Sequence, residues 1–377
     1  MSDNTFHLVE QALRSGGSEA GFDFLARRFR EEKDYPRLFE ARLMKKRHEL
    51  GLPLIQIDQL EDLPNDVRRT YEEGFIQAAR EVGNLFLADG NVQRAWPYFR
   101  AIGETAPIAA AIEQIESQEE IAPIIEIAFH EGVHPRKGFE LILSNYGICR
   151  AITSFHQYPG RNGREECLRL LIRRVHGDVV ENLQRTISRN EGQAPETRSI
   201  PELIAGRDWL FEGNSYYLDT SHVVSVIQFS LELNDPETLA LGLELTEYGS
   251  HLSSLFQYRG DPPFQNVYLD HGIYLRALLG EGVEEAIRHF RNKLTEGDPS
   301  ARGSEPAQVL VRLLARLERY AEAIEVSLEH LHPLDPTQLA CPSVLQLCQL
   351  AGDYTQLMKL AREQGDLLSF AAGVLQT

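Results

Sequence analysis

Hydrophobic residues recur at intervals of three and four positions along almost the whole chain, which is the spacing of amphipathic helices. No stretch shows a sustained alternation of apolar and polar residues, the pattern of a half-buried strand. The pattern therefore predicts an all-α fold with a strand content near zero. Its clearest interruptions contain glycine or proline and fall at residues 15–17, 51–53 and 158–163.

These interruptions divide the chain into predicted helices. The helices are expected over 6–30 with a break at 15–17, 35–50, from 66 onward, 92–103, 108–117, 121–131, 139–155, 165–188, several within 221–279, and short pairs within 282–363. Residues 54–65 are predicted to form a loop, and the polar segment 190–199 is the best linker candidate. One long apolar stripe is expected along Phe139, Ile142, Leu143, Tyr146, Cys149, Ile152 and Phe155.

Residues 74–107 contain small, aromatic and proline residues at characteristic positions. These positions are Gly83, Phe86, Ala95, Phe99 and Pro107, with a turn sequence at 88–91. The spacing resembles a tetratricopeptide helix pair, in which small residues lie where two antiparallel helices cross and the aromatic rings fill the groove. Pro97 departs from the pattern, and we expect it to kink the second helix or delay its start.

The resemblance is good over 74–107, partial over 267–377 and poor between 121 and 261. It implies an α-solenoid of antiparallel helix hairpins, a right-handed stack with an irregular central section. We expect N-terminal helical repeats over 1–120, a divergent histidine-rich section over 121–275 and tetratricopeptide-like helix pairs over 276–377. Such arrays usually bind a peptide or protein in their concave face.

Composition narrows the classes of partner and location. The net charge of −18 argues against nucleic acid and against an anionic membrane surface, since both need clustered Lys and Arg. The apolar runs are far shorter than the roughly 20 residues of a membrane helix. The N-terminus does not resemble a secretory signal, and the four cysteines show no CxxC spacing. We therefore expect a cytoplasmic protein.

A zinc-peptidase-like pattern, H-E-x-x-H, is present at His130–His134. In such enzymes two histidines one helical turn apart bind Zn²⁺, and the glutamate activates water. Here Gly132 lies inside the motif and Pro135 follows it, so we expect the helix to end before His134 reaches the face of His130. The alternative to a peptidase site is a helix end followed by a loop.

Seven of the twelve histidines lie between residues 130 and 271, which makes the central section the place to look for a site. His222 follows a predicted N-cap at Asp219, His251 is on the next helix, and His271 falls in an apolar stripe. If these three histidines converge, they would hold a divalent transition metal. The alternative is that one of them is a core residue, that the others lie at the surface, and that the three bind no common ligand.

Three further residues are candidates for ligand binding, namely Arg150, Tyr217 and Tyr274. An arginine on a helix inside a concave groove suits a carboxylate or phosphate. The alternative for Arg150 is an ion pair with a nearby carboxylate.

The leading hypothesis is a protein-interaction scaffold that binds a peptide or protein. The alternative is a metal-dependent or acid–base enzyme that uses the central histidines. The sequence contains no P-loop, no Rossmann fingerprint and no G-x-S-x-G elbow. It identifies neither the ligand nor the oligomeric state.

Overall fold

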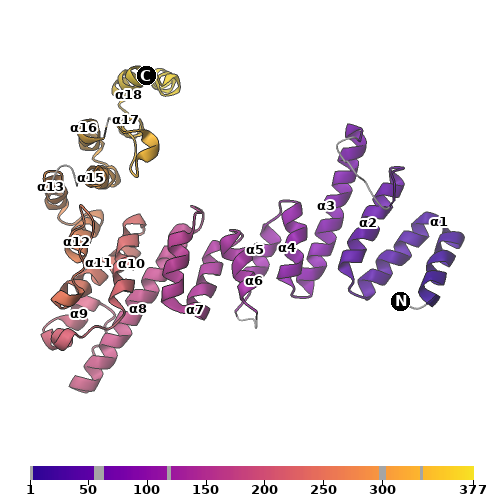
Figure 1. The fold of residues 1–377 in the computed structure, drawn as a ribbon, viewed down its shortest axis with the longest axis horizontal. Coiled ribbons are helices and arrows are strands. Elements are labelled where there is room, and N and C mark those ends of the chain that lie inside the picture. The colour runs from indigo at the N-terminus through magenta and orange to yellow at the C-terminus, as the bar shows by residue number, and fades with distance from the viewer. Residues whose placement is uncertain (1–2, 55–62, 117–119, 297–302, 332–333) are drawn as a thin grey trace. The chain divides into compact units, whose positions relative to one another are not determined.

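The computed structural model describes residues 3–54, 63–116, 120–296, 303–331 and 334–377, and Figure 1 shows that these are mainly helical. The described residues contain no strand, only one isolated antiparallel bridge between Arg259 and Asn266. The predicted all-α class is therefore confirmed. None of the described helices is both long and apolar enough to cross a membrane. Most of the predicted loop at 54–65 lies outside the described residues.

Contacts divide the chain into two compact units. The first comprises Met1–Asn145 with Tyr158–Arg164, and the second comprises Tyr146–Gln157 with Glu165–Thr377. The helices of the first unit are α1 (Asp3–Glu31), α2 (Tyr35–Glu49), α3 (Asn65–Ala88), α4 (Val92–Ala101), α5 (Ala106–Glu113), α6 (Ala122–Ile125) and the π-helical turn η2 (Glu126–His130). Within this unit α1 packs on α2, α2 on α3, and α3 on α4, so neighbours in sequence are neighbours in space.

The predicted close crossing of two helices is confirmed where α3 packs on α4. A Cβ atom added at Gly83 would lie 2.6 Å from Cε2 of Phe99, so no larger residue fits without a shift. Phe86 and Phe99 are buried, and Ala95 is fully buried beside them. The two helices therefore approach closely because small residues face aromatic rings, as the spacing of this window predicts.

Pro97 does not delay the start of α4. The helix begins at Val92 and runs through Pro97 to Ala101. Oδ1 of Asn91 accepts a hydrogen bond from the backbone N–H of Arg94 at 3.0 Å and so caps the first turn. The local capping signal therefore decides where this helix begins.

The helix α7 (Pro135–Gln157) contains a break at Gly147, whose φ of +77° lies in the left-handed region that favours glycine. The expectation of one continuous apolar stripe is wrong here. Phe139 and Phe155 are buried, but Tyr146 is 51% exposed and Cys149 is exposed as well. The regular helical φ/ψ values are interrupted at Gly147, so the residues on its two sides do not continue one stripe.

The second unit contains the remaining helices. They are α8 (Arg164–Glu191), α9 (Ile200–Ile204), α10 (Thr220–Phe229), α11 (Pro236–His251), α12 (Val267–Leu278), α13 (Val283–Lys293), α15 (Glu305–Arg316), α16 (Tyr320–His330), α17 (Val344–Ala351), α18 (Tyr354–Gln364) and α19 (Leu367–Gln376). Among the described residues, 3₁₀ turns lie between them at η3 (Asp208–Asn214), η4 (Ser230–Glu232), η5 (Ser254–Phe256) and η6 (Pro336–Gln338). Helices that follow one another again pack together, notably α11 on α12, α15 on α16 and α18 on α19.

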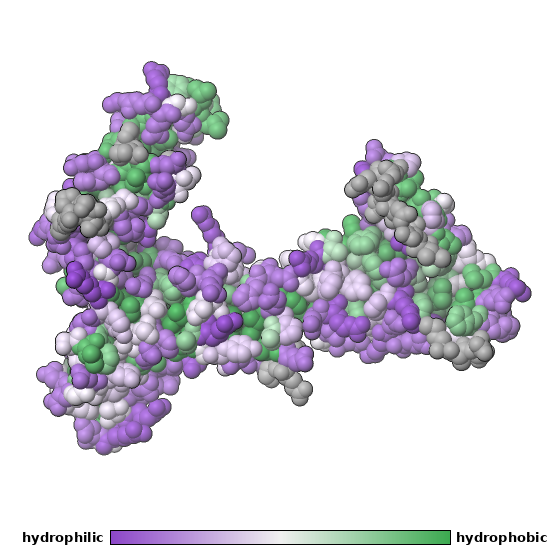
Figure 2. Space-filling view, in the orientation of Figure 1, coloured by the Kyte–Doolittle hydropathy of each residue, from purple (hydrophilic) through white to green (hydrophobic). Residues whose placement is uncertain are grey.

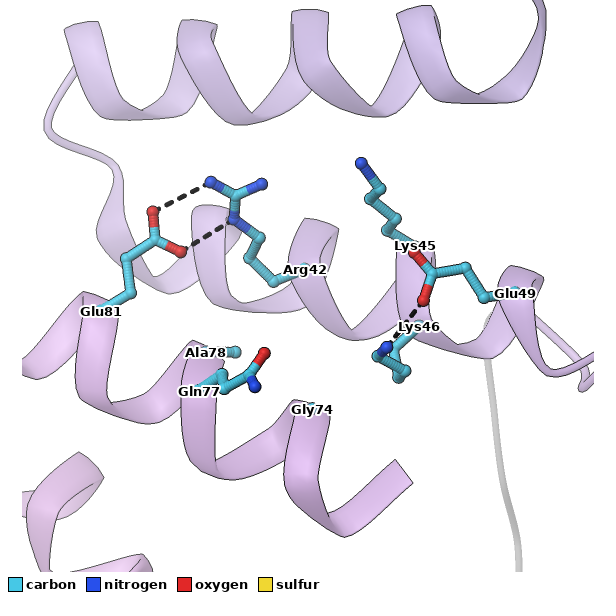
Figure 3. Close-up of a pocket in the computed structure, with 8 residues that line it drawn as sticks. All are labelled: Arg42, Lys45, Lys46, Glu49, Gly74, Gln77, Ala78 and Glu81. Atoms are coloured by element: carbon cyan, nitrogen blue, oxygen red, sulfur yellow. Dashed lines mark hydrogen bonds and ion pairs between the residues drawn. The ribbon is translucent and has the colours of Figure 1, made fainter. Parts of the chain in front are cut away.

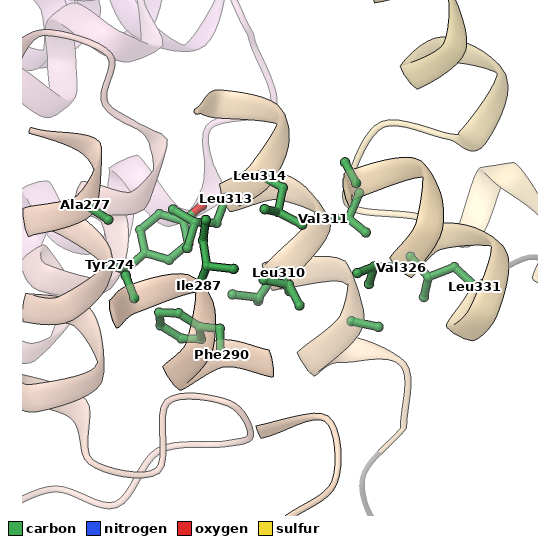
Figure 4. Close-up of a cluster of buried hydrophobic side chains, with 14 of the residues drawn as sticks. Tyr274, Ala277, Ile287, Phe290, Leu310, Val311, Leu313, Leu314, Val326 and Leu331 are labelled. Carbon is green, nitrogen blue, oxygen red and sulfur yellow. The ribbon is translucent and has the colours of Figure 1, made fainter. Parts of the chain in front are cut away.

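A large apolar core joins α12, α13, α15 and α16, as Figure 4 shows. Tyr274, Phe290 and Leu310 are completely buried in it. Burial of a side chain of this size contributes roughly 1.5–3 kcal/mol, so this core is a main source of stability in the second unit.

The candidate linker at 190–199 begins later than expected, because α8 continues to Glu191. The segment that follows is held to α8 by a side chain. Nε2 of Gln184 donates to the carbonyl oxygen of Thr197 at 2.8 Å. These residues connect α8 to α9 within the second unit.

Candidate functional site

The H-E-x-x-H pattern does not form a two-histidine helical site. The π-helical turn η2 ends at His130, Gly132 has a φ of +74°, and Pro135 begins α7. Nε2 of His134 lies 2.8 Å from Oε2 of Glu113, whereas His130 is exposed. Gly132 and Pro135 therefore end the helix as predicted, and the two imidazoles do not lie one turn apart on it.

His271 is a core residue. It is 2% exposed, its Nδ1 donates to the carbonyl oxygen of Val267 at 2.7 Å, and its ring stacks on Phe264 with centroids 4.1 Å apart. Burial lowers the pKa of His271 to about 4, against smaller raising effects of Val267 and Asp270. The imidazole is therefore neutral at physiological pH.

The other two candidate metal ligands lie in different surroundings. His251 is exposed at the end of α11, where Nδ1 bonds to the carbonyl oxygen of Glu247 at 2.9 Å. His222 is half-buried in the first turn of α10, next to the N-cap Asp219. Across the part of the chain that the structure describes, no three His, Cys, Asp or Glu side chains are placed to hold one metal ion. The structure thus does not gather His222, His251 and His271 into one metal site.

The three candidate ligand-binding residues are also separated by their surroundings. Arg150 is exposed on α7 beyond the break at Gly147. Tyr217 donates its hydroxyl to the carbonyl oxygen of Leu210 at 2.7 Å, and its backbone N–H donates to Oη of Tyr248 at 2.7 Å. Tyr274 is completely buried between Phe264 and Phe290, so it belongs to the core rather than to a surface that a ligand can reach.

A polar pocket of about 250 Å³ lies between α2 and α3, and Figure 3 shows its lining. Its cations already have partners. Arg42 binds both carboxylate oxygens of Glu81, at 2.8 and 3.0 Å, and Nζ of Lys46 lies 2.7 Å from Glu49. Burial raises the pKa of Glu81, but the hydrogen bonds and charges of Arg42 and Arg30 together outweigh it and hold that pKa below its usual value. This pocket is a compensated ion-pair network, and its cations have no excess charge to offer an anion.

The second unit exposes large apolar side chains that the periodicity argument did not single out. We call these side chains, together with the half-buried Phe256 and the exposed His251, the aromatic surface, and it consists of Tyr216, His251, Leu255, Phe256, Tyr258 and Leu269. The exposed fractions are 71% for Leu255, 54% for Tyr216, 53% for Leu269 and 39% for Tyr258. A soluble protein rarely exposes such residues together unless they contact another molecule.

Among the members of the aromatic surface, Tyr216 and Phe256 are in direct contact, and Phe256 and Tyr258 also bond to neighbouring residues. The rings of Tyr216 and Phe256 meet edge to face at 5.2 Å. The hydroxyl of Tyr268 donates to the carbonyl oxygen of Phe256 at 3.3 Å, and Oη of Tyr258 lies 2.8 Å from the hydroxyl of Thr220. Leu255 and Phe256 are in the short turn η5, and Tyr216 follows the turn η3. Neither turn has the helical periodicity that marks a core face. The signal in the sequence was the density of aromatic residues at 209–217 and 254–258.

A pocket of about 200 Å³ adjoins this surface in the groove between α11 and α12. Tyr268, Gly272 and Ile273 line it from α12, and Leu269 stands at its edge. Polar groups of Glu247, His251 and Arg276 complete the lining. The ring of His251 also lies 5.4 Å from that of Phe211. The pocket is therefore a shallow apolar groove with one anionic, one cationic and one titratable side chain around it.

Buried tyrosines support this region from below. Burial raises the pKa of Tyr248 to about 12, although hydrogen bonds from the backbone of Tyr217 and Leu218 oppose the shift. Burial also raises the pKa of Tyr268. Both phenols therefore stay protonated at any physiological pH and act as fixed hydrogen-bonding groups.

Comparisons with protein-family models, with curated proteins and with solved structures give no match for this chain. The interpretation of the surface accordingly depends on the residues and their contacts alone.

Proposed function

We propose that this chain is a tetratricopeptide-like α-solenoid that acts as a protein-interaction scaffold, and that the aromatic surface is where it binds a protein or peptide. The solenoid part of the proposal is supported by the order of packing. Helices that follow one another pack against each other, as in α15 to α19, and the α3–α4 pair has the small and aromatic residues of a tetratricopeptide crossing.

The observation that carries the binding proposal is the exposure of Leu269, which lines the α11–α12 groove, together with the exposure of Tyr216 and Leu255 in the same unit. Tyrosine is one of the side chains that supply most of the free energy at protein interfaces. A leucine that a partner removes from water adds roughly 1.5–3 kcal/mol. The groove is small and mainly apolar, so it suits one aliphatic or aromatic side chain of a peptide. Glu247 and Arg276 then offer charge contacts on either side of that anchor.

Tyr217 fits this proposal as a positioning residue. Its hydroxyl is occupied by Leu210, and its N–H is occupied by Tyr248. These two bonds fix the loop that presents Tyr216, so Tyr217 orders the surface without contacting the partner itself.

Panning a random peptide phage library tests the proposal. Peptides are selected on the wild-type chain and then measured against Leu269→Asp, with Leu350→Asp as the matched control. Both leucines are about half exposed, but Leu350 lies on α17, away from the groove residues in sequence. Loss of a central anchor contact costs about 2 kcal/mol or more, so we expect Kd to rise by at least tenfold for Leu269→Asp only. Failure to select any peptide, or equal binding to both variants, would contradict the proposal.

A further inference from the structure

Helix α19 exposes a second apolar surface, in a different part of the chain from the aromatic surface. Leu368 and Leu375 are each 85% exposed, Leu367 is 80% exposed and Val374 is 52% exposed. Ala371 and Ala372 are exposed between the two outer leucines. Figure 2 shows hydrophobic residues gathered over the C-terminal helices, which are yellow in Figure 1.

The other side of α19 is already packed on α18. A Cβ atom at Gly373 would lie 2.6 Å from Cγ of Met358, and Gly373 is buried. The ring of Phe370 lies under the guanidinium of Arg362, at 5.0 Å. The helix is therefore apolar both on its packed side and on its exposed side. A helix with this character is normally covered on both sides.

Four of these exposed residues form a pattern that reads the same in both directions, whereas Leu367 and Val374 lie beside it. Leu368, Ala371, Ala372 and Leu375 stand at positions i, i+3, i+4 and i+7, so they share one face of the helix. Two small residues lie at the centre and one leucine lies at each end. An antiparallel copy of the same helix, related by a twofold axis between the two alanines, would place each leucine opposite the other copy's distant leucine and let the backbones approach closely at the centre.

Charge does not oppose this occupant at the contact itself. The chain has a net charge of −18, so two copies repel each other over most of their surface. The segment 367–377 contains no charged side chain and no histidine. A contact between two copies of α19 thus brings no like-charged side chains directly together.

From the symmetric pattern and the uncharged segment, we propose that α19 is the contact of a homodimer, in which a second copy of this chain packs antiparallel on Leu368, Ala371, Ala372 and Leu375. A partner of different sequence would have to be complementary to this face, but it would not require the face to be symmetric. The proposal goes beyond the peptide-binding function, since it uses another helix and another set of residues.

Sedimentation velocity of the full chain tests the dimer. We expect the wild type to be dimeric at a concentration of roughly 100 µM. The double variant Leu368→Lys with Leu375→Lys should be monomeric at the same concentration and keep the far-UV circular dichroism spectrum of the wild type. Leu350→Lys is the control, because it also places a charge at an exposed leucine and lies in neither proposed surface. A monomeric wild type, a dimer that survives the double substitution, or a dimer that Leu350→Lys also dissociates would overturn the proposal. If the wild type is a monomer, the exposed face of α19 is instead expected to bind a partner of different sequence.

Cross-linking tests the antiparallel geometry and also decides the matter if the double variant does not fold. Ala372→Cys is made in a Cys149→Ser background, because Cys149 is an exposed thiol. Oxidation by oxygen with copper–phenanthroline should join two chains of the Ala372→Cys variant through one disulfide between the introduced thiols, since the alanines flank the axis. Thr355→Cys on α18 in the same background should remain uncoupled. Absence of the disulfide, or equal coupling of both variants, would contradict the arrangement.

Discussion

The ring of Tyr268 lies directly against Gly249, so closely that a Cβ atom at residue 249 would be 2.1 Å from Cδ1 and Cε1 of the ring. Gly249 is in the last turn of α11, and Tyr268 is in the first turn of α12. This contact sets the distance between the two helices that form the groove of the aromatic surface. A glycine is required there because the ring has no space in which to move.

Substitution Gly249→Ala should destabilise the protein by about 1–3 kcal/mol, the usual cost of overpacking a core. The gain of helix propensity from glycine to alanine, about 1 kcal/mol, places the expected result at the lower end. Urea denaturation followed by circular dichroism measures the change. Ser250→Ala, at the exposed neighbouring position, should stay within about 0.5 kcal/mol of the wild type. An unchanged midpoint for Gly249→Ala would show that α11 and α12 can separate freely.

Acidification should destabilise the second unit through His271. Its pKa is about 4 in the folded protein and near 6.5 when unfolded, so between these values the unfolded state binds the additional proton. The part of the free energy of unfolding that depends on a neutral His271 is therefore fully present above pH 6.5, and it is lost as the pH falls toward 4. The shift corresponds to at most about 3 kcal/mol.

The measurement is the free energy of unfolding in urea at several pH values between 7 and 4. The variant His271→Gln should show a smaller loss of stability across this range than the wild type. The variant His251→Gln, at an exposed histidine, should follow the wild-type profile. Parallel profiles for the wild type and His271→Gln would mean that His271 is not the buried neutral group described above.

Elemental analysis separates the scaffold hypothesis from the metalloenzyme alternative. We expect His271→Ala to lower the melting temperature and to leave the metal content of the purified protein unchanged, since Nδ1 of His271 bonds to Val267 within the core. Stoichiometric zinc or another transition metal in the wild type, lost in a folded His271→Ala variant, would instead put the enzyme hypothesis first.

Local features of the sequence were sufficient for much of the helix map. The break near Gly17, the end of α2 before Gly51 and the end of η2 before Pro135 all agree with the predicted positions. The α3–α4 crossing at Gly83 and Phe99 was predictable as well. These features depend on residues that are close in the chain or on one pair of adjacent helices. Their conformational preferences therefore do not require contacts with the rest of the fold.

The candidate site depended on contacts that the sequence does not reveal. A left-handed glycine at 147 interrupts the helix before Cys149, which is exposed, and Tyr146 in the turn before the break is exposed as well. The apolar stripe that His271 and Tyr274 share with Val267 predicted that His271 points inward, and the packing of Phe264 and Phe290 shows which rings enclose the two residues. Periodicity determines which residues lie on one face of a helix. Whether that face is covered is decided by segments far away in the sequence, because burial is a property of two surfaces in contact and not of one.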